Sequence, residues 1–154
     1  MNQSLLPPSL RPDSRVAAWL GRWRQMPVSL ADPALPHAEV PATPPAARAM
    51  LCRALHEFDR RVLPQAVRAA IAGCKHRVGW IAGPPVEDWA PIALHIDAGA
   101  QLWLALQDYE TDEYALWIVG FDRELAPRRL RRAPDLAGAA QPPLPERGEE
   151  VLTF

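Results

Sequence analysis

One apolar stretch, Ile92 to Phe121, constrains this 154-residue chain more than any other feature. It carries two tryptophans and lies between two proline-rich regions, with nine of the 18 prolines in residues 1–45 and five in residues 127–154. Because proline fixes φ and has no N–H, we expect these regions to form extended connecting or wrapping arms. The length suits one domain. We therefore predict a proline-rich arm with one short helix (1–45), a core domain (46–126) and a basic, then proline-rich tail (127–154).

Alternation within the apolar stretch predicts strands. Apolar residues at 92, 94 and 96 alternate with smaller or polar ones, and residues 102–109 and 114–121 follow as two further strands. Pairing Tyr109 with Tyr114 places Leu102, Leu104 and Leu106 opposite Phe121, Val119 and Trp117 on one face. A turn with three loop residues after Asp97 adds Ile92, Leu94 and Ile96 to that face. The prediction is a three-stranded antiparallel meander.

The other face of this meander is also apolar. It carries Trp103, Gln107, Tyr109, Tyr114, Leu116 and Ile118. A face of this composition is not left wholly in water. We expect a proline-rich arm, a second copy of the chain or another protein to cover it.

Helical periodicity precedes the strands. Residues 15–25 follow the capping sequence Pro12-Asp13-Ser14 and place Val16, Trp19, Leu20 and Trp23 on one helical face. A second helix is expected from Ala46, with a break at Leu63-Pro64 and a third segment over 65–72 capped by Gly73. The predicted fold class is α+β, with N-terminal helices packed on a small antiparallel meander of three to four strands and proline-rich terminal arms.

Composition limits the function classes. Lys+Arg 17 against Asp+Glu 18 gives a formal charge of −1, so no overall field favours nucleic acid or an anionic membrane. The N-terminus lacks a signal-peptide pattern, and no apolar span reaches the roughly 20 residues of a membrane helix. We expect a cytoplasmic protein without a membrane association. No sequence motif indicates a metal or a cofactor, and none is predicted.

Three groups of polar residues have alternative interpretations. His95 and Asp97 share a strand face and could form a base and its orienting carboxylate. An acidic group around the last hairpin suits a solvated tip or a docking surface for a basic partner; it includes Asp108, Glu110, Asp112 and Glu113. A basic group after Pro127 could contact phosphates or pair with nearby acids; it comprises Arg128, Arg129, Arg131 and Arg132.

The expected function is a non-enzymatic protein-binding module of bacterial or mobile-element type, such as an adaptor, a chaperone or an inhibitor or immunity protein. Its partner would be another protein or a second copy of the chain. Aromatic residues are suited to anchor interfaces, and the candidates are Trp19, Trp23, Trp89, Trp103, Tyr109 and Tyr114. The alternatives are a nucleic-acid-associated subunit that uses Arg128 to Arg132, and a small hydrolase around His95 and Asp97.

Overall fold

The computed structural model describes residues 8–78, 89–108, 116–133 and 149–154. Within these ranges eight strands form one sheet whose spatial order follows the chain. β3 and β4 are parallel, and every other neighbouring pair is antiparallel. The strands are β1 (Arg11–Asp13), β2 (Ala18–Trp23), β3 (Met26–Ala31), β4 (Trp89–Ile96), β5 (Leu102–Asp108), β6 (Leu116–Phe121), β7 (Pro127–Ala133) and β8 (Glu149–Thr153).

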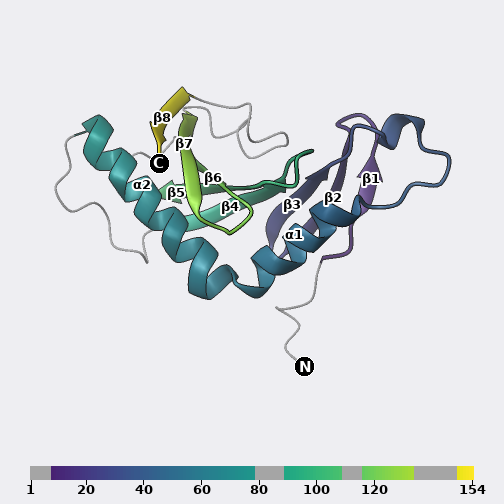
Figure 1. The fold of residues 1–154 in the computed structure, drawn as a ribbon, viewed down its shortest axis with the longest axis horizontal. Coiled ribbons are helices and arrows are strands. Elements are labelled where there is room, and N and C mark those ends of the chain that lie inside the picture. The colour runs from purple at the N-terminus through teal and green to yellow at the C-terminus, as the bar shows by residue number, and fades with distance from the viewer. Residues whose placement is uncertain (1–7, 79–88, 109–115, 134–148) are drawn as a thin grey trace.

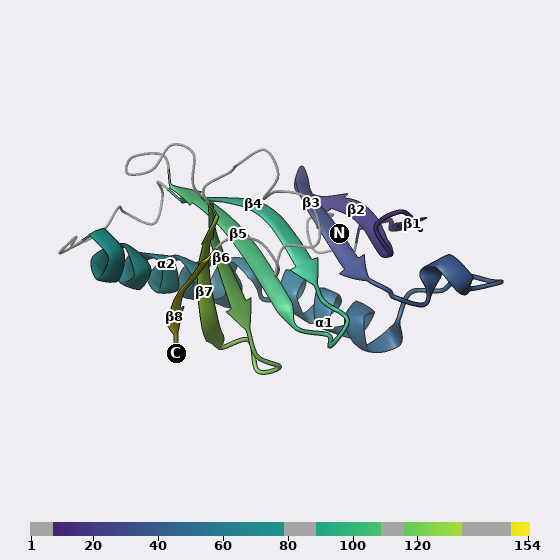
Figure 2. The ribbon, with the colours of Figure 1, turned by 90° about the horizontal axis from the view of Figure 1, so that it is seen from above.

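The helices form the crossover between the two parallel strands. After a short 3-10 turn, η2 (Leu35–His37), the chain forms α1 (Pro45–His56), the π-helical segment η3 (Phe58–Val62) and α2 (Leu63–Val78). Parallel neighbours need such a long connection because their ends lie at opposite edges of the sheet. α1 contacts β3 to β5, and α2 contacts β5 to β8, so the helices line one face of the sheet (Figures 1 and 2). Among the described residues, no helix has both the length and the apolar character needed to cross a membrane.

The main core lies between the helices and this sheet face. The fully buried side chains include Leu51 and Leu55 from α1, Val62 from η3, and Leu30 and Leu104 from the sheet. The helix runs through Gly73, where the sequence predicted its end. Close packing accounts for the glycine, since a Cβ there would lie 2.9 Å from the Trp117 ring and would overlap Leu130. The helix predicted from Ala46 begins at Pro45, and α2 begins at Leu63, where the break was predicted. α1 already ends at His56, however, and η3 lies between the two helices.

The second sheet face is buried within the single chain. Trp103 is 3% exposed, and Leu116 and Ile118 are fully buried. Gly120 leaves room for the Trp103 ring, since a Cβ there would lie 2.8 Å from it, and the Arg129 guanidinium lies 5.5 Å from the ring centroid. Of the aromatic residues expected here, Tyr109 and Tyr114 lie outside the described residues.

The predicted fold class is wrong. Helices on a meander of three to four strands were expected, whereas the sheet has eight strands and takes in β1 to β3 and β7 to β8 from the two proline-rich regions. The predicted pairing of the last two meander strands is confirmed in β5 and β6, where Leu104 pairs with Val119 and Leu106 with Trp117. Ile92 is the exception, because a register shift between Pro91 and Ala93 moves it from the main core to the second face.

No helix forms over residues 15–25, because this segment contains strand β2 and the turn that leads into β3, and the two strands form a β-hairpin. A spacing of four residues keeps Trp19 and Trp23 on one face in either a helix or a strand, so their spacing did not discriminate. Arg24 and Gln25 have φ of 49° and 66°, as a two-residue type I′ turn requires. Neither is the Asn or Gly that normally signals this turn, and the hairpin was therefore missed.

Candidate functional site

The four tryptophans predicted as partner anchors are buried. Their exposed fractions run from 3% to 7%, and they contact the cores on both sheet faces; they are Trp19, Trp23, Trp89 and Trp103. Trp19 donates its indole N–H to Asp32 at 3.1 Å, and Trp103 donates to Asp97 at 3.0 Å. The structure does not gather these residues on one surface. Of the set, Trp23 lines an opening that a ligand could enter.

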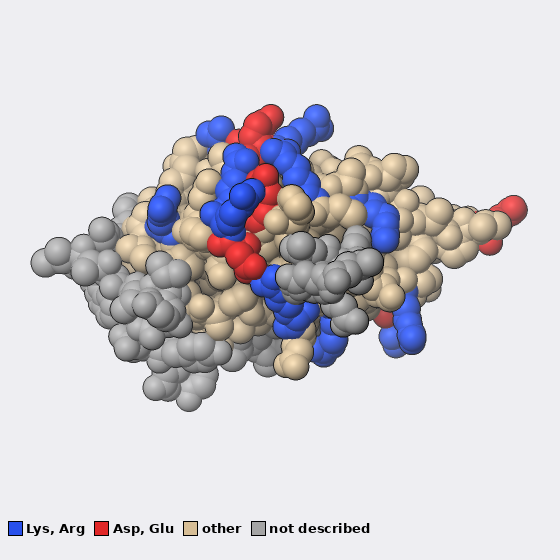
Figure 3. Space-filling model, turned by 90° about the horizontal axis from the view of Figure 1, so that it is seen from below, with Lys and Arg blue, Asp and Glu red and all other residues tan. Residues whose placement is uncertain are grey.

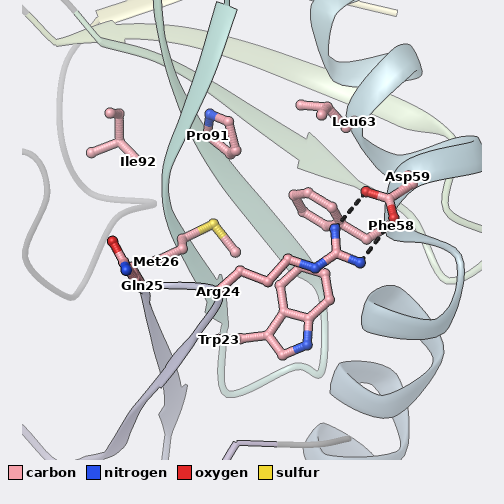
Figure 4. Close-up of a pocket in the computed structure, with 9 residues that line it drawn as sticks. All are labelled: Trp23, Arg24, Gln25, Met26, Phe58, Asp59, Leu63, Pro91 and Ile92. Atoms are coloured by element: carbon pink, nitrogen blue, oxygen red, sulfur yellow. Dashed lines mark hydrogen bonds and ion pairs between the residues drawn. The ribbon is translucent and has the colours of Figure 1, made fainter. Parts of the chain in front are cut away.

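That opening, which we call the junction groove, has a volume of about 480 Å³ and lies where the β2–β3 turn meets η3 (Figure 4). Its lining residues are Trp23, Arg24, Gln25, Met26, Phe58, Asp59, Leu63, Pro91 and Ile92. Trp23, Met26 and Phe58 are buried, and the two rings meet edge to face with centroids 5.0 Å apart. Leu63, Pro91 and Ile92 are half-buried. The groove thus joins a rigid aromatic contact to partly accessible apolar side chains.

An ion pair spans the groove between the hairpin and the helical junction. The Arg24 Nη1 and Nη2 atoms donate to the two Asp59 carboxylate oxygens at 2.7 and 2.9 Å, and the guanidinium carbon lies 4.1 Å from the Trp23 ring centroid. The hydrogen bonds from Arg24 lower the pKa of Asp59. The Asp59 side chain is 62% exposed, so solvent screens the pair and its contribution to stability is small. Arg24 and Asp59 are the ionisable members of this lining set, and they neutralise each other.

The split between two strands opens this groove. β3 and β4 pair through three residues each, Val28 to Leu30 with Leu94 to Ile96. Before that ladder the two strands are not paired, and Met26 on one side and Pro91 and Ile92 on the other line the groove. Pro27 and Pro91 have no backbone N–H, so neither can donate a bond that would extend the ladder toward the groove.

A second opening, the arginine groove, has a volume of about 570 Å³ and lies between α1 and the β4–β5 turn. It is lined by Ala46, Ala49, Met50, Arg53, Ala98, Gly99, Ala100 and Arg123. The Arg53 guanidinium donates to the backbone carbonyl of Arg123, which fixes α1 to the β6–β7 turn. Seen from below the view of Figure 1, the molecule carries a band in which basic and acidic side chains intermingle (Figure 3).

His95 and Asp97, considered above as an alternative catalytic pair, make their hydrogen bonds to other residues. His95 is 1% exposed, and its Nδ1 atom lies 2.7 Å from the Ser29 hydroxyl, itself 5% exposed. Burial lowers the pKa of His95 to about 4, while the charge of Asp97 acts in the opposite direction. Asp97 instead accepts hydrogen bonds from Gly99 N, Gln101 N and the Trp103 indole. The serine was not singled out in the sequence because it is 66 residues from the histidine.

The four arginines of the basic group lie on β7. Arg128 pairs with Asp122 at 2.7 Å, and Arg129 makes two hydrogen bonds to Glu150 at 3.0 and 2.9 Å. Arg131 lies 3.8 Å from Glu150, and Arg132 stacks over the Trp117 ring. All four therefore have contacts inside the chain, among them the expected pairing with nearby acids.

Much of the acidic group cannot be placed. Glu110, Asp112 and Glu113 lie outside the described residues, as does the side chain of Asp108 at the end of β5. Within the described ranges, no group of three or more His, Cys, Asp and Glu side chains is arranged to hold a metal ion.

Comparisons with protein-family models, with curated proteins and with solved structures gave no match to this chain. The two grooves are therefore the features of this chain that bear on its function. In the sequence, Trp23 was singled out but Arg24 and Asp59 were not. They are 35 residues apart, and the missed hairpin is what brings them together.

Proposed function

We propose that this chain is a non-enzymatic protein-binding module that holds an extended apolar segment of a partner protein in the junction groove. One observation carries the proposal: the groove combines half-buried apolar side chains with a single, mutually neutralised ion pair. Apolar surface around a small number of polar groups is typical of recognition sites. Catalysis, in contrast, needs several convergent reactive groups, and the nine residues lining this groove include no such set.

The strand split favours an extended segment as the occupant. Because β3 and β4 separate at Met26 and Ile92, the groove runs between two strands and suits a chain in a similar conformation. Side chains of an extended segment alternate in direction. One set would contact Leu63 and Pro91, and the other would remain near the rim, where Arg24 offers donors and Asp59 offers acceptors.

Local backbone geometry supports a functional role for this region. Arg24 and Gln25 occupy the left-handed region without being glycine, a conformation that costs free energy and is concentrated at functional sites. Short π-helical segments such as η3 are also frequent at such sites. Both features lie on the groove: Arg24 is on the strained turn, and Asp59 is on the π-helical segment.

A site-specific crosslink tests the proposal. A photoreactive amino acid at Gln25, which is exposed at the rim, should crosslink one protein in the native host, whereas the same amino acid at Val16, 43% exposed on the β1–β2 turn, should not. The crosslinked protein is then purified and titrated calorimetrically with the chain. We expect Leu63→Gln to weaken binding at least tenfold, because it places an amide against the apolar segment.

Ile71→Gln is the matched control, since Ile71 is equally half-buried but lies on α2 away from the groove lining. Equal loss of affinity in both variants would show general destabilisation and would contradict the proposal. Equal crosslinking at Gln25 and Val16 would do the same. Crosslinks to nucleic acid in place of protein would favour the accessory-subunit alternative.

A further inference from the structure

We propose that the arginine groove binds a short acidic segment of a partner protein, with Arg53 and Arg123 as the residues that recognise its carboxylates. The inference depends on the proposed function in that the ligand is a protein segment, but it concerns a different surface. The junction groove supplies apolar contacts, and the arginine groove supplies charge. The two grooves share no lining residue.

The two arginines of the groove are not held in ion pairs with the acids nearby. Glu57 is engaged by Arg61 at 3.3 Å, and Asp122 by Arg128 at 2.7 Å. Arg53 and Arg123 each lack an ion pair with a carboxylate among the described residues. Two guanidinium groups at one opening favour an anionic ligand, since a charge-assisted hydrogen bond is about twice as strong as a neutral one.

Arg53 is held in place before any ligand binds. One of its N–H groups donates to the carbonyl of Arg123, so part of the entropy of ordering this long side chain is lost on folding, not on binding. A guanidinium has five N–H donors, and the others remain available for a carboxylate. The backbone bond also links Arg53 to the turn that carries Arg123.

Small residues favour a peptide over a bulkier ligand. Ala46 and Ala49 form one wall, and Ala98, Gly99 and Ala100 form the opposite one, which lets a backbone approach closely on both sides. Met50 is 8% exposed and forms an apolar floor. Six of its eight lining residues are uncharged, and the cationic groups come from the other two. Acidic side chains alternating with alanine fit this arrangement.

The test uses a blocked pentapeptide, acetyl-Glu-Ala-Glu-Ala-Glu-amide, titrated into the isotope-labelled chain and followed by the amide shifts of Ala49, Gly99 and Ala100. We expect saturable shifts at these residues and none with the corresponding lysine peptide. Arg123→Gln should weaken binding at least fivefold. It removes the charge but keeps the backbone carbonyl that holds Arg53, so the fold is preserved. Arg68→Gln, at an exposed arginine on α2 outside this groove, is the control and should bind like the original chain.

Two further variants sharpen the result. Ala49→Leu should block the groove without changing its charge. Glu124→Gln should strengthen binding, because it removes an exposed carboxylate next to Arg123 that repels the acidic peptide. Shifts scattered over all exposed arginines, or equal losses in Arg123→Gln and Arg68→Gln, would overturn the inference. Inorganic phosphate that binds as tightly as the peptide would also overturn it, in favour of a site for small anions. Leu63→Gln should leave peptide binding unchanged, so failure here and failure of the junction-groove proposal are separable.

Discussion

Two hairpin turns of the sheet, residues 97–101 between β4 and β5 and residues 122–126 between β6 and β7, share one hydrogen-bond scheme. In each, an aspartate Oδ1 accepts from the backbone N–H groups two and four residues later. The fourth residue is left-handed, with φ of 60° at Ala100 and 61° at Leu125. The second carboxylate oxygen accepts from the side chain six residues on, which is Trp103 in one turn and Arg128 in the other.

The two turns share this scheme but hold side chains in different environments. Asp97 holds an indole that is 3% exposed, on the sheet face that also contains the Ser29–His95 pair. Asp122 holds an arginine whose side chain is 59% exposed. An unmade hydrogen bond costs most where the group left behind is buried, so the comparison predicts unequal effects from equal substitutions.

The largest expected difference is in the response to pH, and it concerns the Asp97 side. His95 has a pKa of about 4 in the folded protein against about 6.5 when unfolded, so at intermediate pH the unfolded chain binds more protons. The stability associated with neutral His95 is complete above pH 6.5 and is lost as the pH falls through 4, by about 3 kcal/mol in total. Chemical denaturation between pH 7 and 4 measures this loss.

The variant Ser29→Ala/His95→Leu removes the titrating group together with its partner, so no buried hydroxyl is left unpaired. The slope of its unfolding free energy against pH should be smaller than that of the original chain, by the equivalent of about one bound proton over the same range. A slope equal to that of the original chain would show that His95 is not the group responsible.

Asp97→Ala should lower the free energy of unfolding by about 2 kcal/mol, because it leaves the buried Trp103 N–H and two turn N–H groups without their acceptor. Urea unfolding followed by tryptophan fluorescence measures the change. Asp97→Asn retains one carbonyl oxygen and should lose less. An Asp97→Ala effect no larger than that of Asp122→Ala would contradict the difference between the two turns.

These two turns also show how far the sequence could be read. The turn after Asp97 and the register of β5 with β6 were predictable, because alternation of apolar residues leaves one register that keeps them on one face. In β4 the prediction held for Leu94 and Ile96 but not for Ile92, which lies before the register shift. β7 could not be predicted, since Leu130 is the one apolar residue among four arginines. The segment becomes a strand because it pairs with β6 on one side and with β8 on the other.

The candidate site was less predictable than the fold. The arginine groove forms because the fold brings Arg53 and Arg123 together, although they are 70 residues apart in the sequence. Neither residue lies in a local pattern that marks a site. The junction groove depends on a hairpin whose turn residues carry no turn signal and on a parallel strand pair formed across the helical crossover.

Asp122→Ala should lower the free energy of unfolding by about 1 kcal/mol, since it removes the same turn bonds but releases an exposed arginine to water. Burial opposes ionisation of Asp122, yet hydrogen bonds from Ala126 N, the Arg128 side chain and Glu124 N lower its pKa overall. The stability that ionised Asp122 contributes is therefore present above its ordinary pKa of 3.8 and is lost as the pH falls below that value.

Arg128→Gln at neutral pH should change the free energy of unfolding by less than about 1 kcal/mol, because solvent screens the exposed pair of Arg128 with Asp122. A larger effect would show that the pair is not screened.

The smallest expected effect comes from glycine at the left-handed position of each turn, where relief of backbone strain opposes loss of packing. Ala100→Gly should raise the free energy of unfolding by about 0.5 kcal/mol, because glycine adopts a φ of 60° without steric cost and the alanine side chain is only half-buried. Leu125→Gly relieves the same strain but removes a fully buried side chain, so its net effect should be a loss of about 2 kcal/mol. Urea titration of both variants gives the two signs. A loss of stability in Ala100→Gly would mean that the contacts of the alanine methyl group outweigh the strain, and that the two turns differ less than their burial suggests.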